Sequence, residues 1–339
     1  MIRTRATTAA DVAEAAGVSR ATVSHILNGR DANFPEATKS RVREAARALD
    51  YRPSPAGRSL VRGHSDIVVL LLPGATVGAN IQPALERMTA DTADLGANVV
   101  LRVADGNIEQ TIEGLLRMRP LGVVDLGALT ASARARLRAQ GVAVAPDREV
   151  AATGSDHVTR WVAEAQLDAL QPRPGDLVHF AVPSDVSDGF FSAARHRALS
   201  EQAQSRGVCE VRPFSISLSA PDPADIRGLE LSSGRLLVAG YNDLAALATL
   251  SAASRLDVAL AVPDQLAVVG VDATVEAGLW VPRLTTVSVD IAAIVHASMQ
   301  EVRRALGLAG AEPAPVTADA VRIVPGSSTR SADDRTDLG

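Results

Sequence analysis

The chain has 339 residues, more than one hydrophobic core usually organises, so two or three domains are expected. Hydrophobic residues make up 47% and charged residues 22% of it, a composition typical of an ordered protein in water. The apolar run Ile67–Leu72 is too short to span a bilayer, and the first residues lack the apolar core of a signal peptide. The single cysteine excludes an internal disulfide, and no Cys/His cluster has zinc-ligand spacing. We therefore expect a cytoplasmic protein with no metal, no cofactor and no membrane partner.

The net charge of −5 is unevenly distributed along the chain. Residues 1–63 carry eleven basic and six acidic side chains, whereas the other 276 residues carry 23 basic and 33 acidic ones. A small basic head on an acidic body indicates that the head meets phosphate and the body does not. Chance clustering would give the same pattern, so the charge alone leaves the function open.

The head is predicted to form three short helices. Thr8, followed by Asp11, has the pattern of an N-cap, Gly17 can end the first helix, and Ser19 can cap the second. Pro35 is expected near the first turn of the third helix. The predicted inward faces are Val12, Ala13 and Ala16, then Val23, Ile26 and Leu27, then Ala37, Val42, Ala45, Ala46 and Leu49. Two helices crossing tightly after a glycine turn are typical of a helix-turn-helix.

Packing these faces together leaves Arg20, Ala21, Ser24 and His25 on the outside of the second helix. In a helix-turn-helix these positions reach base edges in the major groove, while short polar side chains and Asn28 hold phosphates. An ordinary three-helix domain with a solvated polar face would explain the same spacing.

Two segments carry a family resemblance: Asp11–Gly29 (DVAEAAGVSRATVSHILNG) and Tyr51–Leu60 (YRPSPAGRSL). They resemble the head of the lactose- and purine-repressor (LacI/GalR) family, and the resemblance continues more weakly from residue 75 to about Thr329. It implies a sequence-specific transcriptional regulator, usually a repressor, that binds a pseudo-palindromic double-stranded DNA operator as a homodimer. The residues it implies at the DNA are Thr8, Ser19, Arg20, Ala21, Thr22, Ser24, His25, Asn28, Thr38, Arg58 and Leu60. Of these, Arg20 and His25 are expected to read bases.

The resemblance also implies a hinge helix from Ser54 to Leu60 that folds when two subunits meet on an operator. Leu60 would then wedge into the minor groove and kink the DNA, although a linker residue packed on the body is the alternative. Gly57 replaces the alanine that the family usually has. Since glycine costs a helix about 1 kcal/mol relative to alanine, this hinge should order less readily.

The body alternates between predicted strands and helices, which indicates parallel sheets covered by helices in doubly wound α/β lobes. The expected strands are Ile67–Leu72, Val99–Val103, Val123–Leu126, Leu177–Val182, Leu236–Ala239, Leu266–Val271 and Val321–Val324. The expected helices are Ile81–Leu95, Ile108–Arg117, Ala131–Gln140, Ala193–Arg206 and Asn242–Ala252. No glycine-rich phosphate loop follows the first strand, so nucleotide chemistry is not indicated.

The predicted fold class is an all-α helix-turn-helix head and hinge helix, followed by an α/β two-lobed body like a periplasmic binding protein. The domains expected are a head at 1–52, a hinge and linker at 53–64, a body at 65–329 and a disordered tail at 330–339. The resemblance implies a first lobe at about 65–154 and 286–318 and a second at about 158–281 and 322–329. The three lobe crossings are expected near 153–158, 281–287 and 318–324. The short polar tail predicts a dimer formed through the body and not a tetramer.

A small-molecule effector, sugar-like or otherwise polar, is implied between the lobes. The resemblance matches Asp156, Asn242 and Asp272 to its contacts, and such groups recognise hydroxyls. Solvated loop acids and a helix N-cap are the alternatives. Phe191 stands where the family usually has an arginine, so either Arg195 substitutes from a shifted position or the pocket no longer holds a sugar. A decayed pocket on a constitutive DNA binder is a further alternative.

Two other classes of function compete with a regulator. The body alone would permit a solute-binding transport protein, but the basic head argues against it. An enzyme on the same scaffold is not indicated, because His157, His179 and His196 are scattered without catalytic spacing. Trp161 and Trp280 could stack on a ligand, but core or lobe-interface positions suit them better.

Overall fold

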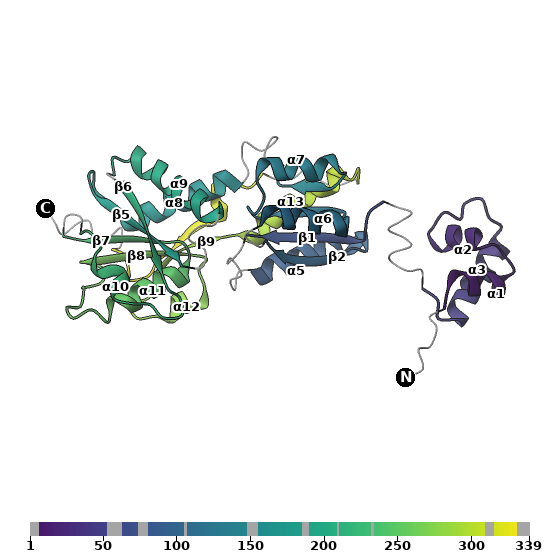
Figure 1. The fold of residues 1–339 in the computed structure, drawn as a ribbon, viewed down its shortest axis with the longest axis horizontal. Helices are drawn as coiled ribbons and strands as arrows, with labels where there is room; N and C mark the ends of the chain where they lie inside the picture. Colours follow the sequence, from purple (N-terminus) through teal and green to yellow (C-terminus); the bar gives the residue numbers. More distant parts are fainter. Residues whose placement is uncertain are drawn as a thin grey trace. The chain divides into compact units, whose positions relative to one another are not determined.

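The structure is a computed structural model that describes residues 7–52, 63–73, 81–104, 107–147, 155–184, 190–208, 210–231, 234–308 and 315–330. The chain divides into two compact units, a head that extends to Asp66 and a body that contains two sheets (Figure 1). Each unit is described by itself. The predicted hinge residues Gly57, Arg58 and Leu60, and residues 331–339 of the predicted tail, lie outside the described residues, whereas Arg330 is described and pairs with Asp264.

The head consists of α1 (Ala9–Ala16), α2 (Arg20–Leu27) and α3 (Glu36–Ala48). A capping box begins α1, because Thr8 Oγ1 accepts the Asp11 N–H at 3.4 Å and Asp11 Oδ2 accepts the Thr8 N–H at 2.7 Å. Gly17 ends α1 in the left-handed conformation, with φ 62°. Ser19 caps α2 by accepting the Thr22 N–H at 3.1 Å. The three predicted helices and their caps are confirmed.

The inward faces of the three helices form one small core. Its buried members are Val12, Ala13, Ala16, Val23, Ile26, Val42 and Ala46. The prediction that Ala37 faces inward is wrong, since Ala37 is exposed. At about 100° per residue, Ala37 lies roughly 140° around α3 from Val42, on a different face. Pro35 precedes α3 as its N-cap residue.

The first lobe of the body contains a four-stranded parallel sheet in the order β2-β1-β3-β4. Its strands are β1 (Ile67–Leu72), β2 (Asn98–Val103), β3 (Gly122–Asp125) and β4 (Ala143–Ala145). Its helices are α5 (Ile81–Thr92), η1 (Ala93–Leu95), α6 (Ile108–Met118), α7 (Ala131–Ala139) and α13 (Ile291–Ala305). The core buries Leu70 from β1, Met88 from α5 and Met299 from α13. Thus α13 completes the first lobe from far along the chain.

The second lobe contains a six-stranded sheet in the order β10-β9-β8-β7-β5-β6. Its strands are β5 (Leu177–Pro183), β6 (Glu210–Ile216), β7 (Leu236–Gly240), β8 (Leu266–Val271), β9 (Thr285–Val289) and β10 (Val321–Val324). Its helices are α8 (Ser155–Leu170), α9 (Phe190–Ser205), α10 (Ala224–Arg227), α11 (Asp243–Ala253), α12 (Val275–Leu279) and η2 (Ala318–Ala320). All strand pairs are parallel except β9 with β10.

Two of the predicted lobe crossings shift in the structure. The first crossing, predicted near 153–158, does not extend that far, because α8 begins at Ser155 and Val158 already packs against the core of the second lobe. The second crossing falls later than predicted, since β9 pairs within the second lobe as far as Val289. The third crossing is confirmed where β10 returns to the second sheet.

No helix among the described residues is long and apolar enough to cross a membrane. The same residues hold no group of three histidine, cysteine, aspartate or glutamate side chains that could bind a metal ion.

Candidate DNA interface and effector cleft

The exposed face of α2 contains the two residues predicted to read bases. Arg20 begins the helix, Ala21 follows it, and His25 lies one turn later, and all three are exposed. The His25 ring packs against Phe34 at 6.1 Å between ring centroids, with the two ring planes tilted by 52°. Arg20 makes no ion pair with any described residue, so its guanidinium is available for bidentate contact with a base edge.

The short polar candidates around α2 are engaged within the head. The Ser19 and Thr22 hydroxyls lie 2.9 Å apart at the start of α2, and Thr8 caps α1. Asn28 Nδ2 donates to the Ser24 carbonyl oxygen at 2.7 Å, while Asn28 Oδ1 is buried without a hydrogen-bond partner. These bonds fix the ends of α2 and so position its exposed face.

Thr38 lies in the first turn of α3 and is half-buried. Its N–H donates to the Pro35 carbonyl oxygen at 2.9 Å. A helix N-terminus attracts phosphate, which is compatible with the DNA contact that the resemblance implies for this position.

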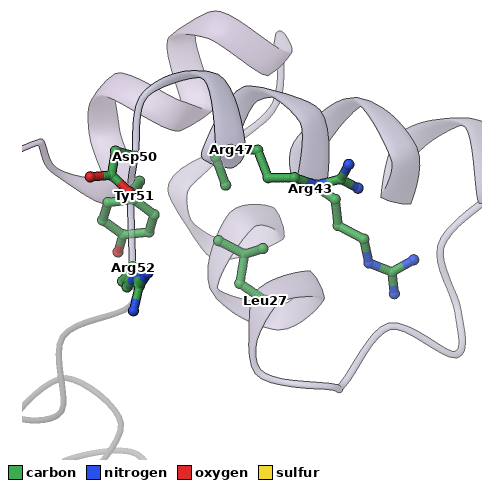
Figure 2. A pocket seen from close by; sticks show the side chains of 7 residues that line it. Leu27, Arg43, Arg47, Asp50, Tyr51 and Arg52 are labelled. Carbon is green, nitrogen blue, oxygen red and sulfur yellow. The ribbon is translucent and has the colours of Figure 1, made fainter.

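A groove on the head was not anticipated from the sequence (Figure 2). It is lined by Leu27, Arg43, Ala46, Arg47, Asp50, Tyr51 and Arg52. Part of the signal was available, because Arg43 and Arg47 are four residues apart on α3 and so share a face, whereas Arg52 follows the end of the helix.

Three of the predicted effector contacts follow neighbouring strands of the second sheet. Asn242 follows β7, Asp272 follows β8, and Phe191 lies in the first turn of α9, which follows β5. Since β5, β7 and β8 are adjacent and parallel, these residues share the carboxyl edge of the sheet, where α/β folds bind ligands. Asp156 lies in the first turn of α8, and its side chain is not among those described.

Asn242 has the alternative role that the sequence left open. Its Oδ1 accepts the Ala245 N–H at 2.9 Å and caps α11. The side chain is only 8% exposed. Because the amide oxygen already accepts this bond, the predicted contact of Asn242 with a ligand would have to be made by its amide nitrogen, and that contact stays a prediction.

A buried carboxylate that the sequence reasoning missed supports Asp272. Asp243 is fully buried and accepts the Thr286 hydroxyl from β9 and the Thr274 N–H at 2.7 Å. Burial raises the pKa of Asp243 above its ordinary value. A Cβ at Gly270 would lie 2.1 Å from Asp243 Oδ1, so only glycine fits there. This network fixes the chain on both sides of Asp272, whose φ is 105°.

Arg195 is not free to contact a ligand in place of the arginine that the family usually has. It is 8% exposed and donates to the Tyr241 carbonyl oxygen. Its guanidinium carbon lies 5.6 Å from the Phe191 ring centroid and 5.2 Å from that of Tyr241. Both rings and the carbonyl thus hold the positive charge inside the second lobe.

The first lobe presents a rigid loop to Phe191. Asp125, at the end of β3, is fully buried, forms an ion pair with buried Arg134, and accepts backbone N–H groups from three residues of the following loop. A Cβ on Gly127 in that loop would lie 3.0 Å from the Phe191 ring. The Phe191 ring of the second lobe therefore occupies the space where a side chain at position 127 of the first lobe would lie.

Comparison with known proteins agrees with both parts of the chain. Residues 8–54 match the model of the bacterial regulatory proteins of the lacI family, and residues 176–329 match the periplasmic binding protein-like domain. A curated relative is the HTH-type transcriptional regulator KdgR of Bacillus subtilis strain 168, 26% identical over 296 residues, covering 83% of this chain and 86% of the relative.

Two solved structures share the fold. A LacI-family regulator from Silicibacter pomeroyi has a TM-score of 0.68 and 22% identity, covering 95% of this chain and 99% of that one. The lac repressor dimer bound to operator and the anti-inducer ONPF has a TM-score of 0.66 and 19% identity, covering 96% and 100%.

The capped helix-turn-helix head and the α/β two-lobed body together define a DNA-binding transcriptional regulator, not an enzyme. The chain thus contains a lacI-family DNA-binding domain and a periplasmic binding protein-like domain, and LacI-family regulators are among the proteins that share its fold.

Proposed function

We propose that the protein is a repressor that binds a pseudo-palindromic operator as a homodimer, in the cytoplasm and at the nucleoid. The observation that carries this proposal is the exposed Arg20–Ala21–His25 face at the capped start of α2. The lac repressor, whose fold this chain shares, is a dimer on operator DNA in its solved structure, and this supports the proposal. A dimer places two such helices on successive major-groove half-sites.

A small molecule bound between the lobes is proposed to control operator binding. A ligand that prefers one lobe arrangement shifts the population of that arrangement, and so the probability that both heads engage together. The carboxyl edge of the second sheet, with Asn242 and Asp272, is the proposed site. Asp156 is proposed to complete it.

The proposed ligand is neutral, polar and hydroxyl-bearing. Carboxylates facing one cleft repel anions, and Arg195 is buried and bonded to the Tyr241 carbonyl, so it is not free to pair directly with a bound anion. Phosphorylated sugars are therefore disfavoured, whereas a nucleoside-like ring could stack on Phe191. The alternative of a decayed pocket predicts no ligand response at all.

Operator binding with and without ligand tests both proposals. A thermal-shift screen of sugars, polyols and nucleosides would find the ligand, and anisotropy with a fragment of the protein's own promoter would measure affinity. Asp272→Ala should keep operator affinity and lose the ligand response. Asp257→Ala is the matched control, because that side chain is 91% exposed. A phosphosugar effector, or a full response in Asp272→Ala, would contradict the assigned cleft.

A further inference from the structure

The groove on the head lies outside the base-reading face of α2. Leu27 from the end of α2 and Ala46 from α3 are among its lining residues. Asp50, Tyr51 and Arg52 line one side of it (Figure 2). None of its residues was matched to a DNA contact by the family resemblance.

The three arginines of the groove differ in whether they form ion pairs within the head. Arg43 Nη2 lies 2.6 Å from Asp31 Oδ2, and its Nη1 lies 3.7 Å from Glu36 Oε1. By contrast, Arg47 and Arg52 are exposed, and neither forms an ion pair with any described residue. With Asp50 as the one acid in the lining, the groove keeps uncompensated positive charge.

The backbone around Arg52 is already ordered. Asp50 adopts a left-handed conformation with φ 45°, which aspartate tolerates better than most residues, and it turns the chain back over α3. The Tyr51 N–H then donates to the Ala46 carbonyl oxygen at 2.8 Å. An anion held here would need little additional ordering of the main chain.

The place of the groove in the head determines which anion it would meet. It lies between the C-terminal end of α2, the helix whose start reads the major groove in the proposed function, and Arg52, which leads into the hinge proposed for the minor groove. A sugar–phosphate backbone separates a major groove from the neighbouring minor groove. The groove therefore faces that backbone when both elements are engaged.

We propose that Arg47 and Arg52 bind backbone phosphates of the operator between the α2 site and the hinge site. This inference rests on the proposed function. The contact is indifferent to base sequence, so it strengthens binding to operator and to other DNA alike.

The salt dependence of DNA binding by the full-length protein tests the proposal. Each phosphate contact contributes about 0.9 to the slope of log affinity against log salt, so Arg47→Gln should flatten the slope of a dimer by about 1.8. When the salt concentration is lowered from 0.2 to 0.05 M, the affinity of both proteins for DNA rises. The increase for Arg47→Gln should be roughly twelve times smaller than the increase for the parent. The Arg47→Gln, Arg52→Gln double variant should lose about twice that slope, on operator and unrelated DNA equally.

Three comparisons make the result specific. Arg197→Gln removes the same charge from an exposed site on the body and should leave the slope unchanged. Arg47→Lys with Arg52→Lys retains the charge and should keep the parent slope. In phosphate-ethylation interference, the parent should be sensitive to a backbone position that no longer matters to the double glutamine variant. Thermal unfolding confirms that each variant is folded, as expected for exposed side chains.

A double glutamine variant with the parent slope would overturn the groove contact while leaving operator binding intact. A loss confined to operator DNA would also overturn it, because that result assigns the arginines to base readout. A parent protein without salt-dependent DNA binding would instead overturn the proposed function, and this inference with it.

Discussion

The ion pair between Asp125 and Arg134 should be a main support of the first lobe. Both side chains are buried, with 2% exposure for Arg134, and Arg134 Nη1 also donates to the Pro146 carbonyl oxygen at 2.6 Å. Arg134→Met keeps most of the volume but removes the positive charge. Asp125 then keeps its backbone N–H donors but loses the guanidinium with which it forms its buried ion pair.

Removing one partner of a buried pair leaves an uncompensated charge, which costs about 3–5 kcal/mol. Urea denaturation should therefore show a free energy of unfolding lower by about that amount in Arg134→Met. Arg136→Met is the matched control on the same helix, because Arg136 is 51% exposed and pairs with exposed Glu109. It should change the unfolding midpoint little.

A second substitution separates charge from packing. In the Asp125→Asn, Arg134→Met variant the amide oxygen can still accept the loop N–H groups without a buried charge, so part of the lost stability should return. If Arg134→Met unfolds at the same urea concentration as the control, the loop N–H groups alone satisfy Asp125. If the double variant is no more stable than Arg134→Met, the loss comes from packing, and the reasoning fails.

Three further predictions concern the recognition helix, the hinge and a buried histidine. Arg20→Ala should weaken operator binding by about 1–3 kcal/mol and relax preference at one base pair per half-site, and equal weakening on all sequences would make it a phosphate contact. Gly57→Ala should tighten operator binding by up to about 1 kcal/mol per subunit, roughly thirtyfold for a dimer, and unchanged affinity would place residue 57 outside the hinge helix. His179 is buried, its Nε2 lies 3.0 Å from the Glu230 carbonyl oxygen, and its Nδ1 has no hydrogen-bond partner. Burial lowers its pKa below the ordinary value near 6.5, so the unfolded chain takes up the proton first on acidification. The contribution of His179 to the free energy of unfolding should therefore be fully present above about pH 6.5. As the pH falls below that value, the free energy of unfolding should decrease by at most about 1.4 kcal/mol per pH unit. Unfolding measured against pH should show a weaker acid dependence in His179→Leu, and an identical profile would refute the assignment.

The head could be predicted almost residue by residue because its signals are local. Thr8 and Ser19 bond to backbone groups three residues away, and Gly17 needs only its own left-handed conformation. The failure at Ala37 arose because alanine is small enough for either side of a helix, so its hydrophobicity alone does not assign a face.

The lobes were predicted as alternating elements, but their site depends on contacts between distant segments. Arg195 meets the Tyr241 carbonyl across 46 positions, and Asp243 meets Thr286 across 43. No local pattern specifies such pairs. Asn242 shows the converse, since its place after a strand fits both a ligand contact and a helix cap, and the structure shows that it is a cap.

The most direct test of the central claim is a DNase I footprint of the full-length protein on its own promoter, together with the mass of the complex in solution. We predict protection of two symmetry-related half-sites by two chains, with cleavage enhanced at the centre where the hinge bends the DNA. Protection of a single half-site, four chains per operator, or equal affinity for promoter and unrelated DNA would contradict a dimeric, sequence-specific regulator.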